Sequence, residues 1–258
     1  MPAGPWLAIT RRDAASSVAS ISPDMAAPCV IASLGASDPG ARQQHWNEHY
    51  NSHRSVRLFH YHLVTSKVRQ AEARYLGKLG FGLVARYGRV GEEQASFAAG
   101  TPWEELDRLG FRLRLSELQR GAVNVVLQPG HWEVPRVDHL GVMLDEDDFA
   151  DVLARADAHG LRVQEHAGRR TFVATNAGYR LEVHPPREWI NDLLVQQDEL
   201  KLAELRLRAD DPAAKAAALR ELLGIEAHDG EVGIGWTIVR FVPGGPQGRP
   251  ELDAERFA

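Results

Sequence analysis

The stretch from Val137 to Pro186 places the strongest constraint on how this chain folds. It begins with the short apolar run VDHLGVML, continues with the segment DEDDFADVLARADAHG, and ends with LRVQEHAGRRTFVATNAGYRLEVHPP. Short β-type runs broken by Gly and Asn are typical of strands, whereas an amphipathic segment that opens on acidic residues and closes on Gly predicts a helix. The stretch therefore predicts one module in the order strand, helix, strand, strand, strand (βαβββ).

A similar pattern precedes this module. RLFHYHLVT at 57–65 predicts a strand, and SKVRQAEARYLGKLG at 66–80 predicts a helix that ends at Gly80. Further strands are expected in FGLVARYG at 81–88, ASFAAG at 95–100 and GAVNVVLQ at 121–128, with an inserted helical segment, TPWEELDRLGF, at 101–111. This pattern predicts a first module with an irregular middle.

The beginning of a third module follows. LAELRLRADDPAAKAAALRELLGIEAHDG and EVGIGWTIVRFVPGG, at 202–245, predict a partial module of βαββ order. The expected fold is therefore α+β, with paired βαβββ modules forming curled mixed sheets around a central cleft, plus a partial third module. The expected boundaries are a flexible N-terminal arm at 1–54, the first module at 55–136, the second at 137–186, a linker and partial third module at 187–245, and a C-terminal tail at 246–258.

Composition restricts the class of function. The net charge of −5 argues against binding to a nucleic-acid backbone, which favours a basic excess. The single cysteine, Cys29, excludes an internal disulfide and a cysteine zinc cluster. No apolar run is long enough to span a membrane, and the first 25 residues lack a signal-peptide core. We expect a cytoplasmic protein that acts on a small molecule without nucleic acid or membrane. Whether Met1 or Met25 is the start, and whether the chain forms a homodimer, stay open.

Residues of metal-ligand type stand on the predicted strands. His139 lies in the first strand of the second module and Glu182 in its last, and the alternation of side chains lets both point away from the helix-covered face. An interior carboxylate such as Glu182 is costly unless it is paired or bound to a metal. In the first module, His60 and His62 share one face of their strand. The alternative for each is a polar residue satisfied within a sheet.

Three segments resemble the vicinal oxygen chelate superfamily, which includes glyoxalase I, methylmalonyl-CoA epimerase, bleomycin-resistance proteins and type I extradiol dioxygenases. They are HYHLVTSKVRQAEARYLGKLGF at 60–81, HLGVMLDEDDFADVLARADAHG at 139–160 and TNAGYRLEVHPP at 175–186. The resemblance covers about 57–186, with a weaker echo at 202–245. It implies that two modules pair around a metal and that the ligands are His139, Glu182 and His60, with His62 as a substitute for His60.

The resemblance also places a fourth ligand in AVNVVLQ, at 122–128. No carboxylate stands there, and Gln128 is the remaining candidate. Two imidazoles and one carboxylate with open positions make the facial triad of non-haem Fe(II) enzymes. The resemblance therefore implies an Fe(II)-dependent dioxygenase that acts on a small, oxygen-bearing substrate, aromatic catechols included. Candidates for moving protons are His62, His184, His166 and Tyr179.

Departures from the family pattern keep other functions open. Val173 and Ala177 stand where the extradiol signature has Tyr and Pro. One alternative is a metal-free binding protein of the bleomycin-resistance kind, with a cleft lined by aromatic residues such as Trp103, Trp132 and Tyr179. Another is a glyoxalase-like or epimerase-like lyase or isomerase that uses Mn, Ni, Co or Zn, with Gln128 or water as the fourth ligand. The nearby His131 and Glu133 are expected to belong to a loop anchored by Trp132.

Overall fold

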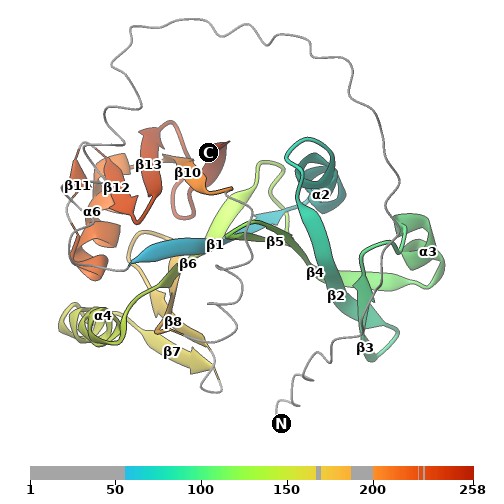
Figure 1. The fold of residues 1–258 in the computed structure, drawn as a ribbon, viewed down its shortest axis with the longest axis horizontal. Coiled ribbons are helices and arrows are strands. Elements are labelled where there is room, and N and C mark those ends of the chain that lie inside the picture. Colours follow the sequence, from blue (N-terminus) through green and yellow to red (C-terminus); the bar gives the residue numbers. More distant parts are fainter. Residues whose placement is uncertain (1–55, 167–169, 187–199, 226, 229) are drawn as a thin grey trace, which may run out of the picture. The chain divides into compact units, whose positions relative to one another are not determined.

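The computed structural model describes residues 56–166, 170–186, 200–225, 227–228 and 230–258 (Figure 1). The predicted N-terminal arm at 1–54 lies outside the described residues, as does the linker at 187–199. Within the described part, the predicted α+β class with repeated βαβββ modules is confirmed.

The first module has the strand order β1-β5-β4-β2, with β5 parallel to β1. On β1 the alternate residues Tyr61 and Leu63 are fully buried, as is Tyr75 of the helix, so one face of the sheet is the helix-covered face. An inserted strand and helix follow β2, and the inserted strand extends the sheet beyond it. The elements are β1 (Arg57–Thr65), α2 (Val68–Gly77), β2 (Gly82–Val90), β3 (Glu93–Ala98), α3 (Trp103–Arg108), β4 (Phe111–Arg120) and β5 (Val123–Pro129).

The inserted helix is held by a buried carboxylate. Glu72 of α2 accepts hydrogen bonds from Arg86 Nε at 2.9 Å, Trp103 Nε1 at 2.9 Å and Ser116 Oγ at 2.6 Å. Glu72 and Arg86 are 2% and 5% exposed, so this ion pair is shielded from water. It ties α2, β2, β4 and the insertion together on the helix-covered face.

The second module repeats the order as β6-β9-β8-β7, with β9 parallel to β6. Its helix begins after Asp145, whose side chain accepts a hydrogen bond from the backbone N–H of Asp148 at 2.7 Å, and this cap satisfies one free donor of the first turn. The elements are β6 (Arg136–Met143), α4 (Glu146–Ala158), β7 (Val163–His166), β8 (Arg170–Ala174) and β9 (Arg180–His184).

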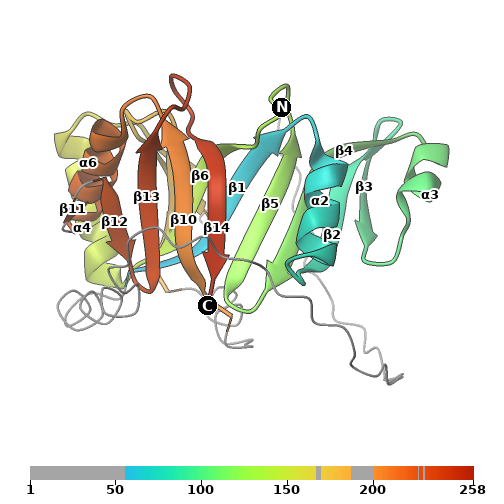
Figure 2. The same ribbon diagram turned by 90° about the horizontal axis from the view of Figure 1, so that it is seen from above.

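The segment predicted as a partial module has the same strand order, β10-β13-β12-β11, although β11 is only two residues long. The predicted tail instead forms β14, which pairs antiparallel with β10 and meets β6 where Glu251 pairs with Arg136. Figure 2 shows β14 between β10 and β6. The elements are β10 (Leu202–Ala209), α6 (Pro212–Leu223), β11 (Ala227–His228), β12 (Glu231–Ile234), β13 (Thr237–Pro243) and β14 (Glu251–Phe257).

Each module begins with an irregular strand. In the pairing of β1 with β6, Phe59 of β1 and Asp138 of β6 have no partner, and Ala203 of β10 has none in its pairing with β14. An extra residue of this kind is a β-bulge, which twists the strand and turns the following side chains. The residues that directly follow the three bulges are His60, His139 and Glu204.

None of the helices in the described ranges is long and apolar enough to cross a membrane.

Candidate metal centre

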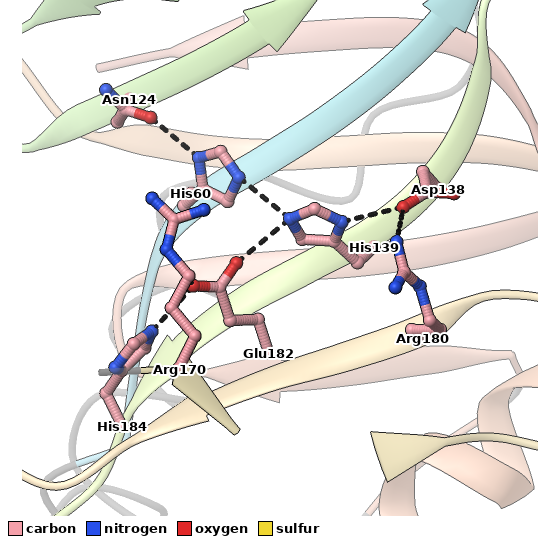
Figure 3. A network of polar contacts seen from close by, with 8 residues as sticks. All are labelled: His60, Asn124, Asp138, His139, Arg170, Arg180, Glu182 and His184. Atoms are coloured by element: carbon pink, nitrogen blue, oxygen red, sulfur yellow. Dashed lines mark hydrogen bonds and ion pairs between the residues drawn. The ribbon is translucent and has the colours of Figure 1, made fainter. Parts of the chain in front are cut away.

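Three side chains from the central strands β1, β6 and β9 meet on the face away from the helices (Figure 3). His139 Nε2 lies 3.1 Å from His60 Nε2 and 3.0 Å from Glu182 Oε2. All three side chains are buried: His60 is 6% exposed, His139 3% and Glu182 2%. The three residues expected to be metal ligands therefore converge, although they come from distant parts of the chain.

The His60 ring is oriented by Asn124 of β5. His60 Nδ1 lies 2.7 Å from Asn124 Oδ1, while Asn124 Nδ2 donates to Glu117 Oε1 at 3.0 Å. Because the amide nitrogen is committed to Glu117, the amide oxygen faces His60 and accepts from its Nδ1–H. Burial, and then the nearby His139, lower the pKa of His60 to about 3. The ring is neutral at pH 7, and its lone pair is on Nε2.

The His139 ring is oriented by Asp138, the bulge residue beside it. His139 Nδ1 lies 2.9 Å from Asp138 Oδ2, and this carboxylate also pairs with Arg180 and, at 2.6 Å, with Arg249. Burial alone would raise the pKa of Asp138, but hydrogen bonds from His139 and Arg180 outweigh it and hold the pKa well below its usual value. An ionised Asp138 accepts from Nδ1–H, so a neutral His139 also has its lone pair on Nε2.

Glu182 is held by its strand neighbour His184. Glu182 Oε1 lies 2.8 Å from His184 Nε2 and 3.5 Å from Arg170 Nε. The other oxygen, Oε2, lies 3.0 Å from His139 Nε2 but lacks the alignment of a hydrogen bond. Burial opposes ionisation here too, yet contacts with His139 and His184 hold the pKa of Glu182 far below its usual value.

His60 Nε2 and Glu182 Oε2 therefore both lie against His139 Nε2, away from water. Buried polar atoms need partners, and either a proton on His139 Nε2 or a bound cation can satisfy them. A divalent metal suits this donor set, since bonds of about 2.1 Å at right angles place neighbouring ligand atoms about 3.0 Å apart, close to the 3.1 and 3.0 Å of the two contacts with His139 Nε2. Glu182 does not belong to the group of ligand atoms that all lie within 4.8 Å of one another, which consists of His60, His62 and His139.

His62 lies beside the same cluster. Its ring centroid is 4.7 Å from that of His139, and one ligand atom from each of His60, His62 and His139 lies within 4.8 Å of the others. These three histidines form a group that can hold a metal ion. Burial lowers the pKa of His62 well below its usual value, and its buried Nε2 has no hydrogen-bond partner within the described residues.

Two other predicted residues do not reach the cluster. The Tyr179 ring stacks on Phe241 of β13, and its hydroxyl faces the backbone oxygen of Lys215 at 3.5 Å. It packs against the third module. His166 is exposed on β7, and its ring contacts Phe172, which in turn contacts His139. Phe172 therefore separates His166 from the proposed ligands.

The loop with His131 and Glu133 is structural, as expected. The hydroxyl of Thr65 donates to the backbone oxygens of Trp132 and Glu133 at 3.0 and 3.1 Å. The His131 ring lies against Trp132, and the Glu133 carboxylate pairs with Lys67.

The strand register identifies the residue of the first module that is equivalent to the proposed ligand Glu182, which is the position of a fourth ligand. His60 pairs with Asn124 and His139 with Arg180, so the residue equivalent to Glu182 in the first module is Val126. Val126 is buried and apolar, and Gln128 lies two residues further along β5, opposite Val64. Gln128 does not occupy the equivalent position. The protein thus supplies an apolar residue at the position of the fourth ligand.

The third module has an ion pair at the corresponding positions. Glu204 pairs with Ile238 in the register in which His139 pairs with Arg180, so Arg240 is equivalent to Glu182. Arg240 Nε lies 3.0 Å from Glu204 Oε1. A guanidinium therefore satisfies this carboxylate.

Several residues of the site were missed in the sequence. Asn124, Asp138, Arg180 and Arg249 orient the ligands, and Arg170 lies beside Glu182. The adjacency of Asp138 to His139 was a readable signal, but strict strand alternation would have placed the two side chains on opposite faces. The bulge removes that separation.

Comparisons with known proteins concern the fold. No protein-family model and no curated protein sequence matches the chain. Among solved structures, a mutant of 4-hydroxymandelate synthase from Streptomyces coelicolor is similar at 12% identity and a TM-score of 0.48, over 74% of this chain and 63% of that one. The Mn(II)-bound glyoxalase from Novosphingobium aromaticivorans is similar at 14% identity and a TM-score of 0.44, over 77% and 64%.

A 2,3-dioxygenase from Pseudomonas sp. KL28 is also similar, at 14% identity and a TM-score of 0.43, over 75% of this chain and 72% of that one. The chain spans less than two thirds of the length of the synthase and of the glyoxalase. Its repeated βαβββ modules are the fold that the resemblance to the vicinal oxygen chelate superfamily implied, and that expectation is confirmed for the fold. Which metal and which reaction this chain supports must be argued from its own site residues.

Proposed function

We propose that the chain is a mononuclear metalloenzyme in which His60, His139 and Glu182 hold a divalent transition metal. The observation that carries the proposal is that two buried atoms, His60 Nε2 and Glu182 Oε2, lie 3.1 and 3.0 Å from the buried His139 Nε2. Asn124, Asp138 and His184 fix their orientation, and such outer contacts are typical of metal sites. In a metal-free binding protein, a proton on His139 Nε2 would have to satisfy both contacts.

The metal we propose is Fe(II), and the reaction is a dioxygenation of a small substrate with two neighbouring oxygens, such as a catechol. Two imidazoles and one carboxylate leave other coordination positions open, and Val126 adds no protein ligand at the position of the fourth. When bound, Fe(II) polarises the substrate oxygens and supplies electrons for the reaction with O2.

The protein residues hold and shield the reacting groups. His184 keeps the Glu182 carboxylate turned toward His139, and Phe172 covers the His139 ring at a centroid distance of 5.1 Å. The neutral His62 has an unpartnered Nε2 beside His139, and it is placed to accept a proton from a substrate hydroxyl. Its low pKa keeps the ring unprotonated in the absence of substrate.

One observation favours a second candidate function, that of a lyase or isomerase with four protein ligands. The ligand atoms of His60, His62 and His139 all lie within 4.8 Å of each other, so His62 is placed to act as a fourth protein ligand. Four protein ligands suit a lyase or isomerase that uses Mn, Ni, Co or Zn without O2.

Metal analysis separates these functions. Protein purified without chelator should contain about one iron per chain and consume O2 with a catechol, whereas another divalent ion without O2 uptake would indicate the lyase or isomerase. His139→Ala and Glu182→Ala should each lose the metal and stay folded. His166→Ala is the matched control, because His166 is exposed and Phe172 separates it from the cluster. Full metal occupancy in both ligand variants would refute the site.

A further inference from the structure

Arg170 of β8 lies at the exposed edge of the proposed metal site, beside Glu182. Its side chain is 56% exposed, and its Nε lies 3.5 Å from Glu182 Oε1. That oxygen already accepts the closer contact from His184 at 2.8 Å. The two terminal nitrogens of Arg170 have no hydrogen bond to any residue that the structure describes. The guanidinium is therefore held through Nε alone, and its two terminal nitrogens can donate hydrogen bonds to a ligand.

The Arg170 side chain extends along Glu182 toward His60, as Figure 3 shows. Its positive charge is among the causes that lower the pKa of His60 on β1, after burial and His139. Burial raises the pKa of Tyr87 on β2, and the Arg170 charge acts against that rise. Arg170 therefore belongs to the second module, and its guanidinium lies beside Glu182 on the side that faces His60 of the first module.

The other two arginines of the cluster are engaged. Arg180 and Arg249 both pair with Asp138, which is buried behind His139. They complete the outer contacts of His139, each with one terminal nitrogen on the Asp138 carboxylate. Arg170, in contrast, has neither terminal nitrogen in a hydrogen bond within the described residues.

We infer that Arg170 binds a carboxylate group of the substrate. The inference rests on the proposed function, since the substrate's two neighbouring oxygens are taken to face the metal held by Glu182. A metal would share the charge of Glu182 and leave the guanidinium without a full counterion. The planar fork of Arg matches a carboxylate with two parallel hydrogen bonds. A single guanidinium suits a singly charged carboxylate better than a phosphate dianion, and Arg180 and Arg249 are directed at Asp138.

The test compares neutral and anionic catechols on protein loaded with Fe(II) without O2. Dissociation constants are measured by calorimetry for catechol, 2,3-dihydroxybenzoate and 3,4-dihydroxybenzoate. The wild type should bind at least one of the dihydroxybenzoates about tenfold or more tightly than catechol, as expected for charge-assisted hydrogen bonds. Arg170→Gln, compared with the wild type at equal metal content, should reduce this preference to about twofold or less.

Arg162→Gln is the matched control. Arg162 is an exposed arginine of the same module and lies just before β7, so its loss removes the same charge without touching the cluster. This variant should keep the preference for the dihydroxybenzoate.

The outcomes distinguish the two proposals. Metal-loaded wild type that binds both dihydroxybenzoates no more tightly than catechol overturns the role of Arg170 and leaves the metal site standing. An unchanged preference in Arg170→Gln overturns it as well. Wild-type protein that binds no metal at all refutes the proposed function, and the role of Arg170 with it.

Discussion

Gly141 of β6 lies directly opposite His60 of β1, and a Cβ atom added to Gly141 would be only 2.7 Å from His60 Cβ and 3.1 Å from its Cδ2. The backbone of β6 therefore passes under the imidazole without a side chain. This bare stretch of strand lets the ring lie across it and reach His139.

Gly141→Ala should displace the His60 ring and weaken metal binding about tenfold or more, the scale on which lost orienting contacts act. Equilibrium competition with a chromophoric chelator measures the change. Gly82→Ala is the matched control, because Gly82 also lies in a strand and a Cβ there would meet nothing closer than Gln119 O at 3.7 Å. Equal metal affinity in the wild type and Gly141→Ala would contradict this reading of the strand pair.

Asp138→Asn should weaken metal binding about 10- to 100-fold while the fold persists. The amide keeps the shape of the carboxylate but loses the charge that holds the His139 Nδ1–H and balances Arg180 and Arg249. The same chelator competition applies. Asp157→Asn, at an exposed position near the end of α4, should leave the affinity unchanged. If both variants bind alike, Asp138 does not orient the ligand.

Acid should destabilise the metal-free protein below about pH 6.5 through His60. Its pKa is about 3 in the fold and 6.5 when unperturbed, so between these values the unfolded chain binds the proton that the folded chain rejects. The stability is present above pH 6.5 and is lost as the pH falls, by up to about 1.4 kcal/mol per pH unit for one group. Denaturant unfolding at pH 7.0, 6.0 and 5.0 measures the slope. His60→Gln should reduce it, and an equally steep slope in this variant would rule out His60 as the source.

Arg86→Met should destabilise the protein by about 3–5 kcal/mol, because it leaves the buried Glu72 without its partner. Denaturant unfolding measures the loss. The double variant Glu72→Gln with Arg86→Met removes the uncompensated charge and should recover part of the stability. A single variant as stable as the wild type would show that Trp103 and Ser116 suffice to hold the carboxylate.

The sequence could predict the modules and the meeting of His60, His139 and Glu182 because strand and helix periods are local properties of a sequence. Two imidazoles and a carboxylate on first and last strands need only the pairing of modules to come together. The strand β4 was missed although the alternation of apolar and charged residues in FRLRL indicates a strand, because the segment follows the inserted helix without a clear break. β14 was taken for a tail because its partner is β10, more than 40 residues earlier in the chain.

The outer contacts of the site could not be predicted for a different reason. Asp138 reaches His139 through a bulge, which depends on how two strands pair and leaves no mark in the composition of either. Arg249 arrives from just before β14, more than 100 residues after Asp138. Contacts of this kind follow from three-dimensional pairing alone.

The bulge that recurs before His60, His139 and Glu204 gives the three modules one common way of turning a side chain. In the third module Arg240 neutralises Glu204, so the corresponding position is already balanced by a charge of the protein itself. The segment that leads into β14 brings Arg249 to Asp138 of the second module. The asymmetry between the modules confines the proposed metal to one position, and we expect a stoichiometry of one ion per chain.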